Sequence, residues 1–211
     1  MKRTIVIVAS LLACFVASAQ STWFCTQKGA VLSYVQTDAD GKETNKFQNV
    51  VKDVEKKDGK TVITYDVVMP LLNRTSEGCQ VWTDGSYFYT DAAASMGQIG
   101  NGLEVTGHGP VLPEDPTPGM SIPDCSVSIE SLATTVNYSK IRFARQEQIS
   151  TPAGDFVCWC LEYESNSKMA FIQTVSKNEQ WYAKGVGLVK YVMKDKKGKV
   201  QSVQELVKIE K

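Results

Sequence analysis

Most of this chain alternates between apolar and polar residues with a period of two, and Asp-Gly and Gly-Lys pairs interrupt the alternation. In the segment 61–69, Ile63, Tyr65, Val67 and Met69 occupy alternate positions. Successive side chains of a β-strand point to opposite faces, so this pattern predicts strands with one apolar face. The glycine-containing pairs favour the positive φ angles of tight hairpin turns. The sequence therefore predicts a mainly β, antiparallel fold.

Hairpins are predicted around Asp58-Gly59, around Asp84-Gly85 and around the segment 152–155. The segments 38–42 and 195–199 share an Asp-x-x-Gly-Lys pattern, which predicts two matching hairpin turns. Further strands are expected at 141–149, 156–164, 170–175, 180–184, 187–194 and 200–209.

Helical signals are scarce. Asp91–Ile99 is the best candidate, with Asp91 as N-cap and Gly100 as stop signal, and a single helical turn is expected within 71–76. The segment 107–123 contains five prolines and three glycines, which exclude a helix interior or a central strand. We expect it to be a long proline-rich loop within a single β-rich domain at 20–211, and a two-lobed protein is the alternative.

The N-terminus has the three parts of a secretory signal peptide. Lys2 and Arg3 precede an apolar run that extends to Val16 with only Ser10 interrupting it, and Ala17-Ser18-Ala19 supplies small residues for cleavage. The run is shorter than the roughly 20 residues of a transmembrane helix. We therefore predict a signal peptide at 1–19 and a periplasmic, cell-surface or secreted protein. Lipidation at Cys14, within Leu11-Leu12-Ala13-Cys14, is the less favoured alternative.

The charge of the chain gives no sign of nucleic-acid binding. The sequence carries 23 basic and 23 acidic residues, and cleavage removes Lys2 and Arg3 but no acid, leaving a net charge of about −2. A nucleic-acid binder needs a clustered basic surface. The lysines in 194–199 and at 56–57 flank turn signals and are expected to be solvated hairpin tips.

Five cysteines follow the predicted cleavage site: Cys25, Cys79, Cys125, Cys158 and Cys160. Disulfides are common outside the cytoplasm, but an odd number leaves at least one thiol without a partner. Cys158 and Cys160 are two apart on one strand, so they share a face and are badly placed to bond to each other. Cys-x-Cys is not a zinc-knuckle spacing, and no metal site is predicted. Buried thiols that act as small apolar residues are favoured, and the pairing stays open.

Two segments of the C-terminal half carry a family resemblance: Thr151-Pro152-Ala153-Gly154-Asp155-Phe156-Val157-Cys158, and 179–190 with its Lys184-Gly185-Val186-Gly187 link. They resemble exported bacterial proteins of the TapB-like family, which is related to a larger group of unknown function. The resemblance implies an antiparallel, strongly curved sheet or partial barrel, broadly similar to envelope lipoprotein carriers. The helical signals described above add one or two short helices to this fold. It implies no catalytic residues. Cys125 and Cys160 are not expected from the pattern, so the cysteine pairing cannot be transferred.

Three function classes are compared. An enzyme is disfavoured because the only histidine, His108, lies in the proline-rich loop and no Gly-x-Ser-x-Gly motif is present. We predict a noncatalytic protein without cofactor that binds a lipid or another hydrophobic or amphipathic ligand on a concave sheet face. Candidate ligand-binding residues are Trp159, Trp181, Tyr182 and Tyr191, although large aromatics on strands more often belong to the core. The alternative is an assembly or structural protein of the cell envelope that acts through protein contacts.

Overall fold

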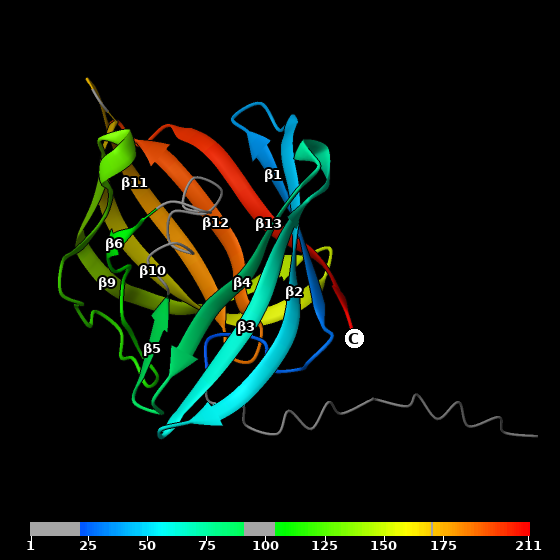
Figure 1. Cartoon of the computed structure of the whole chain (residues 1–211). Helices are drawn as coiled ribbons and strands as arrows, with labels where there is room; N and C mark the ends of the chain where they lie inside the picture. The colour runs from blue at the N-terminus through cyan, green and yellow to red at the C-terminus, as the bar shows by residue number, and fades with distance from the viewer. Residues whose placement is uncertain (1–21, 91–103, 170) are drawn as a thin grey trace, which may run out of the picture.

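The computed structural model describes residues 22–90, 104–169 and 171–211. Its strands form one antiparallel sheet, which is strongly curved and not closed (Figure 1). The predicted mainly β, antiparallel and curved fold is therefore confirmed. The strands in chain order are β1 (Val31–Asp38), β2 (Glu43–Lys57), β3 (Lys60–Met69), β4 (Arg74–Thr83), β5 (Tyr87–Thr90), β6 (Thr106–Gly107), β7 (Leu112–Pro113), β8 (Cys125–Ile129), β9 (Thr134–Thr151), β10 (Gly154–Met169), β11 (Ile172–Ala183), β12 (Gly187–Asp195) and β13 (Val200–Glu210).

The predicted hairpin turns form where glycine was expected to permit them. Asp58 and Gly59 both have positive φ, at 50° and 75°, and connect β2 to β3. Two positive φ angles in a two-residue loop match the right-handed twist of the paired strands. Asp38 and Asp195 begin two turns of the same design, because each carboxylate accepts the backbone N–H groups two and four residues later.

The order of strands explains how the sheet curves without closing. β8 to β13 are neighbours in chain order, β13 pairs with β1, and β1 to β5 continue the sheet. The short strands β6 and β7 form the two edges, next to β8 and β5 respectively. Both edges therefore come from the chain between β5 and β8, which includes the predicted proline-rich loop. Pro113 lies on edge strand β7, where a missing N–H costs least.

The main core lies on the concave face of the sheet. Its side chains come from both halves of the chain, so β1 to β5 and β8 to β13 are held together by the same apolar cluster. Fully or almost fully buried members include Leu32, Val51, Ile63, Val81, Phe88, Phe143, Leu161 and Leu206.

A second apolar cluster lies on the other face of β10, β11 and β12. Cys158 and Cys160, both buried, pack there with Trp181. Ile149 of β9 and Val203 of β13 join this cluster although three strands separate them in the sheet. The ends of β9 and β10 therefore bend across the outer face of the sheet. Register shifts in their pairing, between Cys160 and Leu161 and between Glu162 and Glu164, accompany the bend.

Some local predictions differ from the structure. The segments 170–175 and 180–184 were predicted as separate strands, yet β11 is continuous from Ile172 to Ala183. Its polar middle looked like a connection, but Asn178 is buried and hydrogen-bonded. The predicted turn in 71–76 is a 3-10 turn at Pro70–Leu72, and strand β4 begins at Arg74. A second 3-10 turn spans Glu130–Leu132.

Three predictions concern residues outside the described part of the chain. The helix at Asp91–Ile99, the signal peptide at 1–19 and the lipidation alternative at Cys14 all lie there. Within the described residues, no helix is long and apolar enough to span a membrane.

Candidate ligand cavity inside the curved sheet

The concave face of the sheet encloses a cavity of about 300 Å³. It is lined by side chains from β1 to β5 on one side and from β9 to β13 on the other, with the floor formed by the segment before β1. Its lining residues are Trp23, Phe24, Tyr34, Phe47, Asn49, Tyr65, Val67, Val81, Phe88, Thr90, Pro110, Leu112, Tyr138, Leu161, Tyr163, Gln180, Tyr182, Leu188 and Gln204.

Two aromatic residues near the start of the described chain form the floor of the cavity. Trp23 is fully buried and stacks on Phe143, with ring centroids 5.8 Å apart, while its edge contacts Tyr182 at 6.4 Å. Phe24 lies against Tyr65, with centroids 4.9 Å apart. Aromatic pairs at these separations add to the stabilisation that burial itself supplies. The floor is therefore closely packed and apolar.

A buried ion pair fixes the proline-rich loop below this floor. Glu114 is only 2% exposed, and its carboxylate accepts hydrogen bonds from the Thr83 hydroxyl, at 2.7 Å, and from the Lys184 ammonium. The ammonium also lies 4.0 Å from the centre of the Trp23 ring. The Trp23 indole donates to the carbonyl of Pro113 at 2.9 Å. These contacts join the loop, the N-terminal segment and the β11–β12 connection.

The polar groups inside the cavity are uncharged. Tyr182 donates its hydroxyl proton to the Gln180 side chain at 3.0 Å. Burial raises the pKa of Tyr182 and of Tyr163 above the ordinary value of a phenol. The phenols therefore stay protonated over the physiological pH range. Among the described lining side chains none is charged, so the cavity suits a neutral molecule with a few hydrogen-bonding groups.

The four predicted ligand-binding residues occupy different places. Tyr182 lines the cavity. Trp159 packs against Phe143 beside it, with centroids 5.9 Å apart, and Tyr191 bonds to the buried Asn178. Trp181 belongs to the outer cluster, where its indole donates to Glu147 at 2.7 Å. The structure thus brings together Tyr182 and Trp159 around the inner face and places Trp181 on the opposite face.

Sequence reasoning missed three residues that shape the cavity: Trp23, Phe24 and Glu114. The first two stand close to the predicted cleavage site, and an aromatic pair directly after a signal peptide could have suggested a tethered N-terminal segment. Glu114 carries no such signal, because its burial depends on Lys184, which is 70 residues away.

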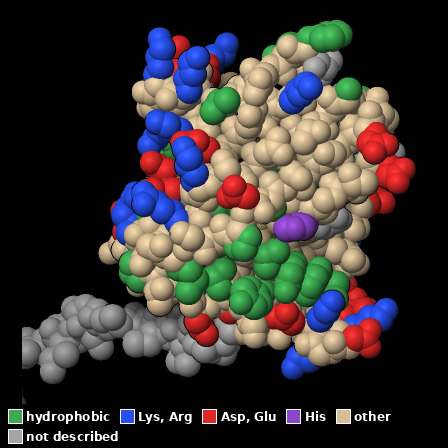
Figure 2. Space-filling model, turned by 90° about the vertical axis from the view of Figure 1, so that its left-hand side faces the viewer, with side chains coloured by type: hydrophobic (Ala, Val, Ile, Leu, Met, Phe, Trp, Pro, Cys, Tyr) green, Lys and Arg blue, Asp and Glu red, His purple; other side chains and the backbone are tan. Residues whose placement is uncertain are grey.

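The residues considered for catalysis or metal binding lie apart from the cavity lining. His108 is exposed on the surface (Figure 2), and its Nδ1 is 2.8 Å from the carbonyl of the next residue. In the described part of the chain, none of the five cysteines forms a disulfide. Burial raises the pKa of Cys158 and of Cys160 to about 12. A thiol that stays protonated is a poor nucleophile and a poor metal ligand.

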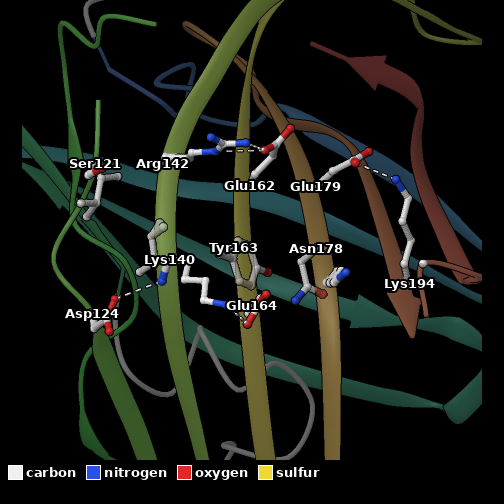
Figure 3. A pocket seen from close by; sticks show the side chains of 14 residues that line it. Ser121, Asp124, Lys140, Arg142, Glu162, Tyr163, Glu164, Asn178, Glu179 and Lys194 are labelled. Atoms are coloured by element: carbon white, nitrogen blue, oxygen red, sulfur yellow. Dashed lines mark hydrogen bonds and ion pairs between the residues drawn. The ribbon is translucent and has the colours of Figure 1, made fainter. Parts of the chain in front are cut away.

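A second and more open depression, of about 680 Å³, lies on the outer face across β9 to β12 (Figure 3). Six of its charged side chains form pairs: Arg142 contacts Glu162 at 2.7 Å, Lys140 contacts Glu164 at 2.9 Å, and Lys194 contacts Glu179 at 2.6 Å. Ion pairs across neighbouring strands stabilise their pairing modestly. Because most of these charges already pair with each other, the inner cavity is the better candidate site despite its smaller volume.

The fold and the cavity define a class of protein: a curved antiparallel sheet, open along one side, that encloses an uncharged and largely aromatic cavity. The DUF3108-like family matches residues 27–206, and the chain belongs to that family. The narrower TapB-like assignment stays a prediction. A search of curated proteins finds no significant match.

Two solved structures share the fold. One is a protein of Bacteroides fragilis proposed to be exported and described as having a YmcC-like fold, with 21% identity, a TM-score of 0.72 and coverage of 89% of this chain and 98% of that chain. The other is a proposed lipoprotein of Parabacteroides distasonis, with 18% identity, a TM-score of 0.73 and the same coverage of both chains.

Proposed function

We propose that this protein is an exported, noncatalytic binder that holds a small, neutral, hydrophobic or amphipathic molecule inside the curved sheet. One observation carries the proposal: the cavity of about 300 Å³, with aromatic and aliphatic walls and a few uncharged polar groups. Ligand sites in proteins are typically concave, mostly apolar and roughly 300–1,000 Å³ in volume.

The chemistry of the lining narrows the ligand class. Asn49, Gln180 and Gln204 offer amide groups to a ligand, and Tyr182 offers a phenol. A charged headgroup enclosed in this cavity would lose its hydration without gaining a counter-charge among the described lining residues. The ligand is therefore an uncharged molecule, or the uncharged part of a larger one whose charged end stays in water.

Export is supported by the predicted signal peptide at 1–19. It is also supported by the two structural neighbours, one of which is proposed to be exported and the other to be a lipoprotein. The noncatalytic part of the proposal is supported by the position of His108, which does not line the cavity. It is also supported by the raised pKa of the buried thiols.

The proposal is tested by native mass spectrometry of the protein purified gently from its own cell envelope. We expect a removable adduct of lipid-like mass. Val67→Trp places a large ring in the cavity and should remove the adduct, whereas Val157→Trp, at an exposed position outside the cavity lining, should retain it. His108→Ala should also retain the adduct. Circular dichroism verifies that each variant is folded.

A bare mass for the wild-type protein, together with no binding of the neutral fluorescent probe N-phenyl-1-naphthylamine, would overturn the proposal and favour an assembly role in the envelope. An adduct that a folded Val67→Trp variant retains would place the ligand elsewhere. The intact mass measured under denaturing conditions also identifies the N-terminal residue of the processed protein. A chain that starts at Gln20 indicates simple export, and an acylated chain that starts at Cys14 indicates a lipoprotein.

A further inference from the structure

Five connections of the sheet lie at one end of the molecule, uppermost in Figure 1. Adjacent strands are antiparallel, so the β1–β2, β3–β4, β8–β9, β10–β11 and β12–β13 connections all emerge at the same end. We call this end the upper rim and define it as the described residues of 38–43, 69–74, 129–134, 168–173 and 195–200.

The upper rim carries its most exposed large apolar side chains on two separate projections, and Leu132 of the β8–β9 connection is 42% exposed. At the β10–β11 connection Phe171 is 103% exposed and Ile172 is 70% exposed. At the β3–β4 connection Leu71 and Leu72 are 60% and 55% exposed. Of the other exposed large apolar residues in the described chain, Leu132, Met169 and Val175 lie at the rim or at its adjoining strand ends. Tyr87 and Val157 lie away from it. Apolar exposure is therefore concentrated at this rim.

Local geometry holds the two leucines outward. Pro70 begins the 3-10 turn and Asn73 ends it in the left-handed conformation, with φ of 46°. The turn is too short to bury its own side chains, and none of its residues is buried. The exposure of Leu71 and Leu72 is thus a consequence of a defined turn.

Basic side chains surround the apolar projections. Lys168 adjoins the Phe171 projection, Arg74 adjoins the two leucines, and Lys196 and Lys197 line a shallow depression together with residues 173–175 of β11. These four side chains are exposed. Of the rim carboxylates, Asp38 and Asp195 are occupied by backbone N–H groups of their own turns. Exposed acids at the rim are Asp40, Glu43 and Glu130.

We propose that the upper rim docks on a lipid surface that carries anionic headgroups. Phe171, Ile172, Leu71 and Leu72 enter the interfacial region, and the neighbouring lysines and arginine contact the headgroups. Apolar tips flanked by basic residues bind membranes in this way. A specific protein partner needs about 800 Å² of continuous complementary surface on each side, whereas a lipid surface accepts two separated projections without shape matching. This inference goes beyond the cavity proposal and does not depend on it.

The test measures co-sedimentation of the exported protein with vesicles of phosphatidylethanolamine and phosphatidylglycerol, and with vesicles of phosphatidylcholine alone. We expect binding to the anionic vesicles, and at least about tenfold weaker partitioning for Phe171→Ser/Ile172→Ser. Leu71→Ser/Leu72→Ser should weaken it similarly. Val157→Ser is the control, because it removes an apolar side chain that is 65% exposed, close to Ile172 and Leu71, but lies away from the rim, and it should leave binding unchanged.

A Phe171→Trp variant reports the depth of contact. The emission of the tryptophan introduced at position 171 should shift to shorter wavelength when anionic vesicles are added, and brominated lipid should quench it. The proposal is overturned if the wild-type protein binds neither vesicle, or if the Ser variants bind as well as Val157→Ser. It is also overturned if sedimentation velocity shows that Phe171→Ser/Ile172→Ser converts a dimer into a monomer, because a second copy of the chain would then cover the rim.

Discussion

At the scale of single residues, Glu114 is the most constrained charge of the described chain. It is almost fully buried in the proline-rich loop, where Thr83 and Lys184 satisfy its two carboxylate oxygens. Breaking a buried ion pair costs more than forming it stabilises, because the remaining charge stays partly desolvated. Lys184 is 32% exposed, so solvent screens part of that cost.

We predict that Glu114→Gln lowers the free energy of unfolding by about 1–3 kcal/mol. Glutamine keeps the size of the side chain and can still accept from Thr83, but it removes the negative charge that the Lys184 ammonium contacts. Urea unfolding followed by tryptophan fluorescence measures the change. Glu210→Gln is the control, because its pair with Lys208 is solvent-exposed and should contribute under about 0.5 kcal/mol. Equal unfolding midpoints for the two variants would show that the pair does not hold the loop.

At the scale of elements, the hairpins of the sheet follow from local sequence and the sheet edges do not. Asp58-Gly59 specifies a turn through its own φ preferences, so β2 and β3 could be predicted with their connection. The edge strand β6 could not, because its two residues become a strand only by pairing with Val127 and Ser128 of β8. The continuity of β11 was missed because Asn178 looks like a loop residue until Tyr191 and Ser165 are placed beside it.

Gly107 shows how closely the edge strand β6 is packed. Its φ is +89°, and a Cβ at this position would lie 2.0 Å from the carbonyl oxygen of Ser126, which is backbone and cannot yield easily. Gly119 has a similar φ of +82° but open space around it. An alanine at either position would therefore be strained by the positive φ. Only at Gly107 would its Cβ also overlap backbone atoms.

We predict that Gly107→Ala destabilises the protein by more than about 2 kcal/mol, whereas Gly119→Ala costs about 1 kcal/mol. Thermal unfolding of both variants, monitored by circular dichroism, gives the comparison. Hydrogen exchange at β8 distinguishes global destabilisation from local detachment of β6. If the two alanine variants unfold at the same temperature, the close approach of Gly107 to β8 is not maintained in solution.

At the scale of the whole molecule, the cavity exists because segments far apart in the sequence meet around it. The alternation of residues predicts which side chains share a face of each strand, and Tyr182 was placed on such a face. It does not say which face becomes concave, so Trp181 and Tyr182 could not be separated by pattern alone. The curvature follows from register shifts and from the bend of β9 and β10, which depend on contacts with β13.

The two apolar clusters of the sheet bury several weak acids, and this predicts how stability depends on alkaline pH. Burial raises the pKa of Cys125 to about 11 and that of Cys158, Cys160 and Tyr138 to about 12, from ordinary values of 9.0 for a thiol and 10.0 for a phenol. Below about pH 9 both the folded and the unfolded chain keep these protons, and the full stability is present. Above it the unfolded chain loses protons that the folded chain retains.

The free energy of unfolding should therefore fall as pH rises from about 9 towards 12, by up to about 1.4 kcal/mol per pH unit for each group. Urea unfolding in reducing buffer at a series of alkaline pH values measures this slope. Cys158→Ala/Cys160→Ala removes two of the groups and should make the slope shallower, even though the variant starts from a lower stability because two buried side chains become smaller. A slope unchanged by the double substitution would mean that water reaches the outer cluster and that its thiols ionise in the folded state as readily as in the unfolded chain.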